Sequence, residues 1–194
     1  MIRKTTLLLL LLALSANHTF GQKAALKTNL LYIGSTYTPN LSLEIGLGRR
    51  STLDIGAGYN PWNLKGENSN NKKLVHWLGT AEYRYWFCEK FNGHFIGGHA
   101  LGSQYNISGH NLPLLFGKGS KDYRYQGWAV GGGVSYGYQW VLGKHWNLEA
   151  TVGVGYAYLN YDQYNCGTCG SRVGSGVRHY IGPTKAGVSL IYTF

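Results

Sequence analysis

The chain has 194 residues, of which 29 are glycine, 16 tyrosine and 6 tryptophan, and only 13% are charged, whereas soluble domains average roughly 25% charged residues. This composition disfavours a soluble protein and favours strands that cross a bilayer between girdles of aromatic side chains. The formal net charge of +10 suits an anionic membrane surface or nucleic acid, and the export signal described next argues against nucleic acid.

The first 21 residues have the features of a secretory signal peptide. Arg3 and Lys4 form a positive start, Leu7 to Leu14 form an apolar run, and Gly21 ends a segment with small residues at the cleavage positions. The run is too short for a membrane helix of roughly 20 residues, and no later segment reaches that length. We expect residues 1–21 to be a signal peptide and 22–194 to form a single outer-membrane domain.

Eight segments of alternating polarity follow the signal peptide, and such a period of two is typical of strands. Short connections alternate with longer ones rich in Gly, Asn, Ser and Lys, as in outer-membrane barrels with short periplasmic turns and longer external loops. The sequence predicts an all-β fold, an eight-stranded antiparallel up-and-down transmembrane β-barrel with both termini periplasmic. The expected strands are 24–34, 41–48, 51–60, 73–87, 93–106, 123–141, 146–162 and 179–194.

Bulky apolar and polar residues fall on opposite faces of these strands. In 73–87, for example, Trp77, Tyr83 and Tyr85 oppose Glu82 and Arg84. A soluble lipocalin-like barrel has an apolar interior, so this pattern favours apolar faces toward lipid and a polar lumen. Both faces of 93–106 are mixed, and the pattern does not assign them.

The inward faces carry more acids than bases. Buried charges must be paired and hydrogen-bonded to be tolerated, and an eight-stranded barrel has just enough interior for side chains to fill. We expect a lumen plugged by salt bridges; a gated pore, an ion path or a catalytic carboxylate pair are the alternatives. The predicted network comprises Lys27, Glu44, Asp54, Glu82, Arg84, Glu149 and Lys185.

The pair Cys166 and Cys169 lies in the last predicted external loop. In an oxidising compartment a local disulfide is the expected state, with free thiols or a metal site as alternatives. A zinc site would need two further ligands, for which His110 and His179 are the candidates. Cys88 falls at the opposite end of the barrel, too far away for a disulfide.

Histidines and serines raise the possibility of an enzyme acting on lipid A. Such an enzyme would use a histidine to activate a hydroxyl nucleophile. No spacing among these residues matches a nucleophile motif, so we expect no catalytic activity, no cofactor and no resident metal. The residues concerned are His76, His94, His99, His110, His179, Ser103 and Ser108.

The closing segment has the clearest alternation in the chain. Val188, Leu190, Tyr192 and Phe194 share one face, opposite Ser189 and other mostly small or polar residues. A terminal aromatic in such a strand resembles the signal read by the barrel-insertion machinery. We expect Tyr192 and Phe194 to form this insertion signal.

Several motifs resemble a family of Bacteroides-type outer-membrane β-barrel proteins of unknown function, often encoded near fimbrial genes and similar in architecture to small OmpA/OmpX-like barrels. The resemblance covers essentially the whole mature chain. It implies the barrel and the compartment but no activity. In that compartment the basic charge favours contact with lipopolysaccharide, and we expect an envelope or fimbrial protein as a further partner. The motifs are Lys27-Thr28-Asn29-Leu30-Leu31-Tyr32, Thr38-Pro39-Asn40-Leu41, Gly56-Ala57-Gly58-Tyr59-Asn60-Pro61-Trp62, Arg84-Tyr85-Trp86-Phe87-Cys88-Glu89, Asn92-Gly93-His94-Phe95 and His99-Ala100-Leu101-Gly102.

Overall fold

Antiparallel strands make up almost all of the computed structural model, which describes residues 24–64, 72–110, 123–165 and 170–194. The elements in chain order are β1 (Ala24–Asn29), α2 (Leu30–Thr36), β2 (Asn40–Gly46), β3 (Ser51–Asn60), β4 (Asn63–Leu64), β5 (Lys72–Trp86), β6 (Gly93–Ser108), β7 (Tyr123–Val141), β8 (Trp146–Asn165) and β9 (Arg172–Thr193). Within these residues no helix is long and apolar enough to cross a membrane.

Eight of the strands form a closed ring. Each long strand pairs antiparallel with its neighbour in sequence, and the ladder between β1 and β9 joins the two ends of the chain. The ladder between β3 and β5 passes over the two-residue β4, which pairs only with the start of β5 in the described part of the chain. The predicted all-β fold with eight antiparallel up-and-down strands is confirmed.

The predicted first strand, 24–34, is wrong in its second half. β1 ends at Asn29, whose side-chain Oδ1 accepts hydrogen bonds from the backbone N–H groups of Leu31 and Tyr32 and so caps helix α2. This local capping outcompetes the strand that the alternation predicted. Tyr37, with φ of 52°, ends the helix in the left-handed conformation.

The last strand is longer than predicted. β9 begins at Arg172 rather than at residue 179, so seven residues of the segment 163–178, expected to be an external loop, belong to a strand that pairs with β8. Residues 172–178 have the polar, Gly- and Ser-containing composition of a loop, yet they pair with β8 as a strand.

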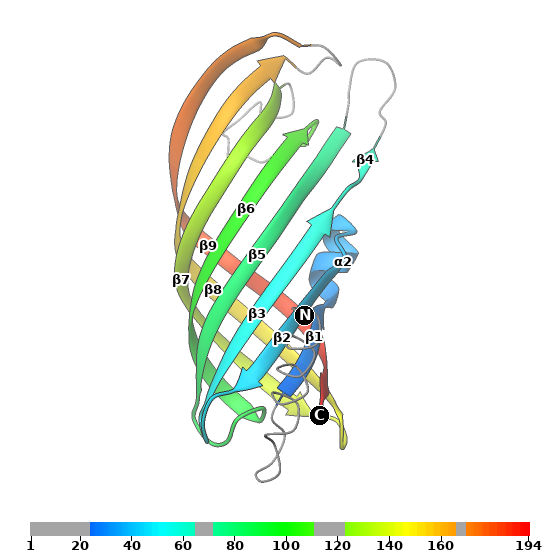
Figure 1. Ribbon diagram of the computed structural model, residues 1–194, viewed down its shortest axis with the longest axis vertical. Helices are drawn as coiled ribbons and strands as arrows, with labels where there is room; N and C mark the ends of the chain where they lie inside the picture. The colour runs from blue at the N-terminus through cyan, green and yellow to red at the C-terminus, as the bar shows by residue number, and fades with distance from the viewer. Residues whose placement is uncertain (1–23, 65–71, 111–122, 166–169) are drawn as a thin grey trace, which may run out of the picture.

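The ring is much taller on one side than on the other (Figure 1). β1 has 6 residues and β9 has 22. We call the end that carries the tight connections 47–50, 87–92 and 142–145 the turn end, and the opposite end the loop end. At the loop end β7, β8 and β9 rise well beyond β1 and β2.

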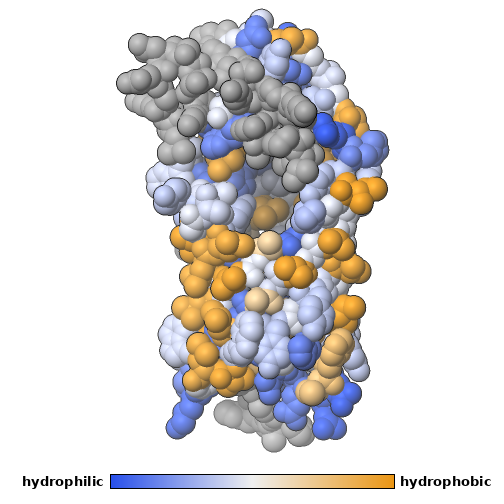
Figure 2. Space-filling model, turned by 180° about the vertical axis from the view of Figure 1, so that it is seen from behind, coloured by the Kyte–Doolittle hydropathy of each residue, from blue (hydrophilic) through white to orange (hydrophobic). Residues whose placement is uncertain are grey.

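Large apolar side chains cover the outer face of the ring, and Figure 2 shows them gathered across the middle of one side. The predicted apolar faces are the exposed ones, as with Leu43, Trp77 and Val152. The structure also assigns the strand that the pattern left open: in β6, Ile96 lies outward, whereas Phe95 and His99 are buried.

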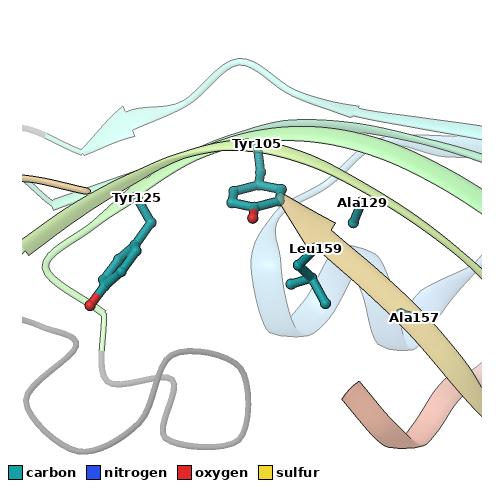
Figure 3. Close-up of a cluster of buried hydrophobic side chains, with 5 residues drawn as sticks. All are labelled: Tyr105, Tyr125, Ala129, Ala157 and Leu159. Atoms are coloured by element: carbon teal, nitrogen blue, oxygen red, sulfur yellow. The ribbon is translucent and has the colours of Figure 1, made fainter. Parts of the chain in front are cut away.

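A small apolar cluster lies on the inner side of the tall wall at the loop end (Figure 3). It joins β6, β7 and β8 and gives this part of the wall a core of its own. Its buried members are Tyr105, Tyr125, Ala129, Ala157 and Leu159.

Candidate functional site

The polar interior of the ring is the candidate site. Six strands contribute its charged residues, because inward positions recur at every second residue and the ladders place Glu44 beside Asp54 and Asp54 beside Glu82. The structure brings all seven residues of the predicted network together. Six are almost fully buried, whereas the side chain of Lys185 is 24% exposed.

Lys27 on β1 is a three-way junction of this network. Its Nζ lies 2.7 Å from Glu44 Oε2, 3.2 Å from Asp54 Oδ2 and 2.8 Å from Glu149 Oε2. An ammonium has three N–H donors, so each proton has a carboxylate acceptor.

Arg84 on β5 joins all four carboxylates. Its Nε lies 2.5 Å from Glu82 Oε2, one terminal nitrogen lies 3.0 Å from Glu44 and 2.8 Å from Glu149, and the other lies 3.0 Å from Asp54. Lys185 adds a bond of 2.7 Å to Glu82. Removing one partner from such a network leaves uncompensated buried charge, which is costly.

Hydroxyl groups complete the shell around the acids. Thr151 donates to Glu149, Ser135 to Glu82, and Thr52 to Glu44. The indole N–H of Trp86 in turn donates to Thr52 Oγ1 at 3.0 Å. The charged network is therefore held by a second layer of oriented donors.

Aromatic side chains close the turn end below the network, a feature that the sequence prediction missed. Trp86, Phe91 and Phe95 are buried and in contact, and the guanidinium carbon of Arg84 lies 4.4 Å from the centre of the Phe95 ring. Trp86 could have been found, since it shares the inward register of Glu82 and Arg84. Phe91 lies in a turn with positive φ, where alternation gives no signal.

A cavity of about 270 Å³ lies next to the charged network. Asp54, Arg84, Glu149 and Lys185 form part of its lining. Other lining residues include His99, Thr80, Thr184, Asn29, Tyr32 and Leu101. The interior is thus partly filled by salt bridges and partly open.

Four of the five histidines considered for catalysis are bound to hydroxyl groups other than those of Ser103 and Ser108. His76 bonds to Tyr32, His94 to Tyr136 and His179 to Tyr156. His99 bonds through Nε2 to Thr184 at 2.9 Å. Ser103 instead donates to the backbone carbonyl of Trp77.

The two cysteines predicted to form a disulfide, Cys166 and Cys169, lie outside the described residues. Cys88 is exposed and free in the turn between β5 and β6. Within the described segments no group of three or more His, Cys, Asp or Glu side chains could hold a metal ion.

The predicted insertion signal lies at the seam of the ring. The backbone N–H of Phe194 donates to the carbonyl of Ala24 at 2.9 Å, and the Tyr192 ring packs edge-on against Trp146 and Phe194. Phe194 is exposed on the outer face.

Fold and interior together define a small protein built as a closed ring of eight antiparallel strands around a buried ionic core. Residues 5–194 match the family described as "Protein of unknown function (DUF3575)". The chain belongs to this family. No curated protein and no solved structure matches it significantly.

Proposed function

We propose that this chain is an integral β-barrel of the cell outer membrane with both termini in the periplasm. The observation that carries the proposal is the distribution of polarity, with large apolar side chains on the outer face and the ionic network inside. Monomeric soluble proteins rarely expose contiguous apolar patches above a few hundred Å². In a bilayer, lipid rather than water surrounds these side chains, so the free-energy cost of exposing them to water is removed.

The height of the apolar belt fits a bilayer. On β8 the exposed apolar residues run from Trp146 through Val152 and Val154 to Tyr156, a segment of 11 residues. A transmembrane strand needs roughly 9–11 residues. Aromatic residues at both ends of the segment match the interfacial belts of membrane proteins.

The proposed role is structural or interactive rather than catalytic. The buried ionisable groups are engaged with one another, as in the contacts of Lys27 and Arg84, which suits a plug more than a reaction centre. Lipopolysaccharide would meet the basic loop end, and an envelope or fimbrial protein is the proposed partner. Tyr192 and Phe194 would serve the insertion machinery.

Fractionation of cell envelopes tests the location. The protein should stay with the outer membrane after alkaline carbonate washing, and its electrophoretic mobility in detergent should shift on heating, as closed barrels unfold only when heated. Recovery in the soluble fraction without detergent would refute the proposal.

A narrow gated channel is the second candidate function, and the cavity beside the network favours it. Planar bilayers separate the two roles. A plugged structural barrel should give no stable conductance, whereas a steady, ion-selective current that Arg84→Ala increases would establish the channel.

A further inference from the structure

The ionic network carries one more negative than positive charge. Four carboxylates, those of Glu44, Asp54, Glu82 and Glu149, face three cations, Lys27, Arg84 and Lys185. With His99 neutral, the interior has a net charge of −1. Buried charge of this kind calls for a counter-charge.

Besides this excess negative charge, the network has one carboxylate oxygen without a partner among the described residues. Four carboxylates have eight oxygens, and seven of them accept hydrogen bonds or ion pairs from the network or its hydroxyl shell. Asp54 Oδ1 is the only carboxylate oxygen of the network without a partner among the described residues. Asp54 is 94% buried, with a relative exposure of 6%, and lines the cavity.

A second unsatisfied atom belongs to the same cavity. His99 is only 7% exposed, and its Nδ1 has no partner within the described part of the chain. Its Nε2 is bonded to Thr184. In the tautomer whose Nε2 donates to the threonine hydroxyl, Nδ1 is an acceptor, and this tautomer gives the cavity two buried acceptors.

We propose that this cavity binds a small protonated amine, which donates its N–H groups to Asp54 and His99. The three N–H groups of Lys27 are engaged and all three guanidinium nitrogens of Arg84 contact carboxylates, so the surroundings of Asp54 Oδ1 favour a donor over an anion. Lys185, the third cation in the lining, is bonded to Glu82. One free carboxylate oxygen is too few for a divalent cation such as Ca²⁺, which takes at least six oxygen ligands. A volume of about 270 Å³ accommodates an alkylammonium of a few heavy atoms together with water, at about 30 Å³ per water molecule.

The cavity lies beside the point where the ladder between β1 and β9 ends. β9 pairs with β1 only from Ser189 to Thr193, and helix α2 lies alongside β9 where that ladder ends. Asn29 and Tyr32 line the cavity from the side of β1 and α2, and Thr184 and Ala186 from the side of β9. The Asn29 side-chain amide donates to the Ala186 carbonyl at 3.1 Å between the two sides. The ammonium can therefore belong to a free amine or to a lipid headgroup that reaches in from the side; only the lipid source depends on a membrane location.

Calorimetric titration of the full-length protein in amine-free detergent with ethylammonium tests the site. The protein should bind one equivalent, and Asp54→Asn should weaken binding about tenfold or more, as expected for loss of a charged hydrogen-bond partner. Tetramethylammonium, which has the same charge but no N–H, should bind more weakly than ethylammonium by a similar factor. Asp162→Asn is the matched control, because Asp162 pairs with Arg172 on the outside of the site, and it should leave binding unchanged.

A second variant guards against misfolding of Asp54→Asn. Thr184→Leu fills cavity space and removes the hydroxyl that bonds His99 Nε2, without changing any formal charge, and should also reduce binding about tenfold or more. Native mass spectrometry of protein reconstituted with equal amounts of phosphatidylethanolamine and phosphatidylcholine identifies the source. Preferential retention of the ethanolamine lipid, lost in Thr184→Leu, shows that the ligand is a lipid headgroup, whereas saturable ethylammonium binding without lipid preference shows a free amine. The proposal is overturned if neither ethylammonium nor the ethanolamine lipid binds, or if both variants bind as well as the parent protein does.

Discussion

Arg84 is the residue on which the ionic network depends most, because it pairs with all four of its carboxylates. It contacts four carboxylates and an aromatic ring while almost fully buried. Arg84→Ala should lower the free energy of unfolding by about 3–5 kcal/mol, because it leaves buried carboxylates uncompensated. Urea unfolding in lipid vesicles measures the loss.

The pair between Arg172 and Asp162 supplies the control for this prediction. Its side chains are 55% and 35% exposed, and exposed ion pairs contribute at most about 1 kcal/mol. Arg172→Ala should therefore change stability little. Equal losses for the two variants would show that the interior network does not hold the ring together.

The sequence predicts best which face of a strand each residue occupies. It places Lys27, Glu82 and Glu149 on inward faces, and the structure finds them in one network. Alternation cannot say which atoms stay unsatisfied, since this depends on how side chains from six strands meet. Asp54 Oδ1 and His99 Nδ1 emerge only from the assembled ring.

β7 and β8 pack so closely that Gly133 on β7 has no room for a side chain. A Cβ on Gly133 would lie 2.7 Å from Gly155 Cα and against the carbonyl oxygen of Val154. Gly133→Ala should therefore cost about 1–3 kcal/mol through overpacking, measured by the same urea unfolding.

Gly98 on the neighbouring strand β6 is the matched position. A Cβ there meets nothing within 4 Å among the described atoms, so Gly98→Ala should stay within about 0.5 kcal/mol of the parent protein. If both alanine variants were neutral, the close approach of β7 and β8 would not constrain the sequence.

Element boundaries proved less predictable than the elements themselves. Helix α2 replaces the end of a predicted strand because the Asn29 side chain satisfies the first helical N–H groups, a local effect that alternation does not register. β9 starts earlier than predicted because pairing with β8 gives strand structure to residues with loop-like composition. Local capping shortens one predicted strand, and tertiary pairing lengthens another.

The whole molecule is organised around an outer belt that is apolar and an interior that is charged. Sequence periodicity was sufficient to predict the closed ring of eight strands, since all the long strands except 93–106 show the same clear two-residue alternation. It did not predict the uneven height of the ring, because the height depends on where each ladder ends.

An arginine in the belt distinguishes lipid from water around the ring. Val152 is 64% exposed between Trp146 and Tyr156, so Val152→Arg should cost nothing in water but about 2–4 kcal/mol in a bilayer. Val173 is 54% exposed near the loop end of β9, beyond the belt, and Val173→Arg should be tolerated. Equal effects of the two substitutions in lipid vesicles would argue against a bilayer-spanning belt.

The location of the belt can be measured directly by spin labels. In a variant whose cysteines Cys88, Cys166 and Cys169 are replaced by serine, single labels are placed at positions 152 and 173, and the protein is reconstituted in lipid. In a ring that spans the bilayer, the label at 152 should collide freely with oxygen, which concentrates in the bilayer, and little with a water-soluble nickel complex, whereas the label at 173 should show the reverse. Ready access of the nickel complex to both labels would contradict a membrane-spanning ring.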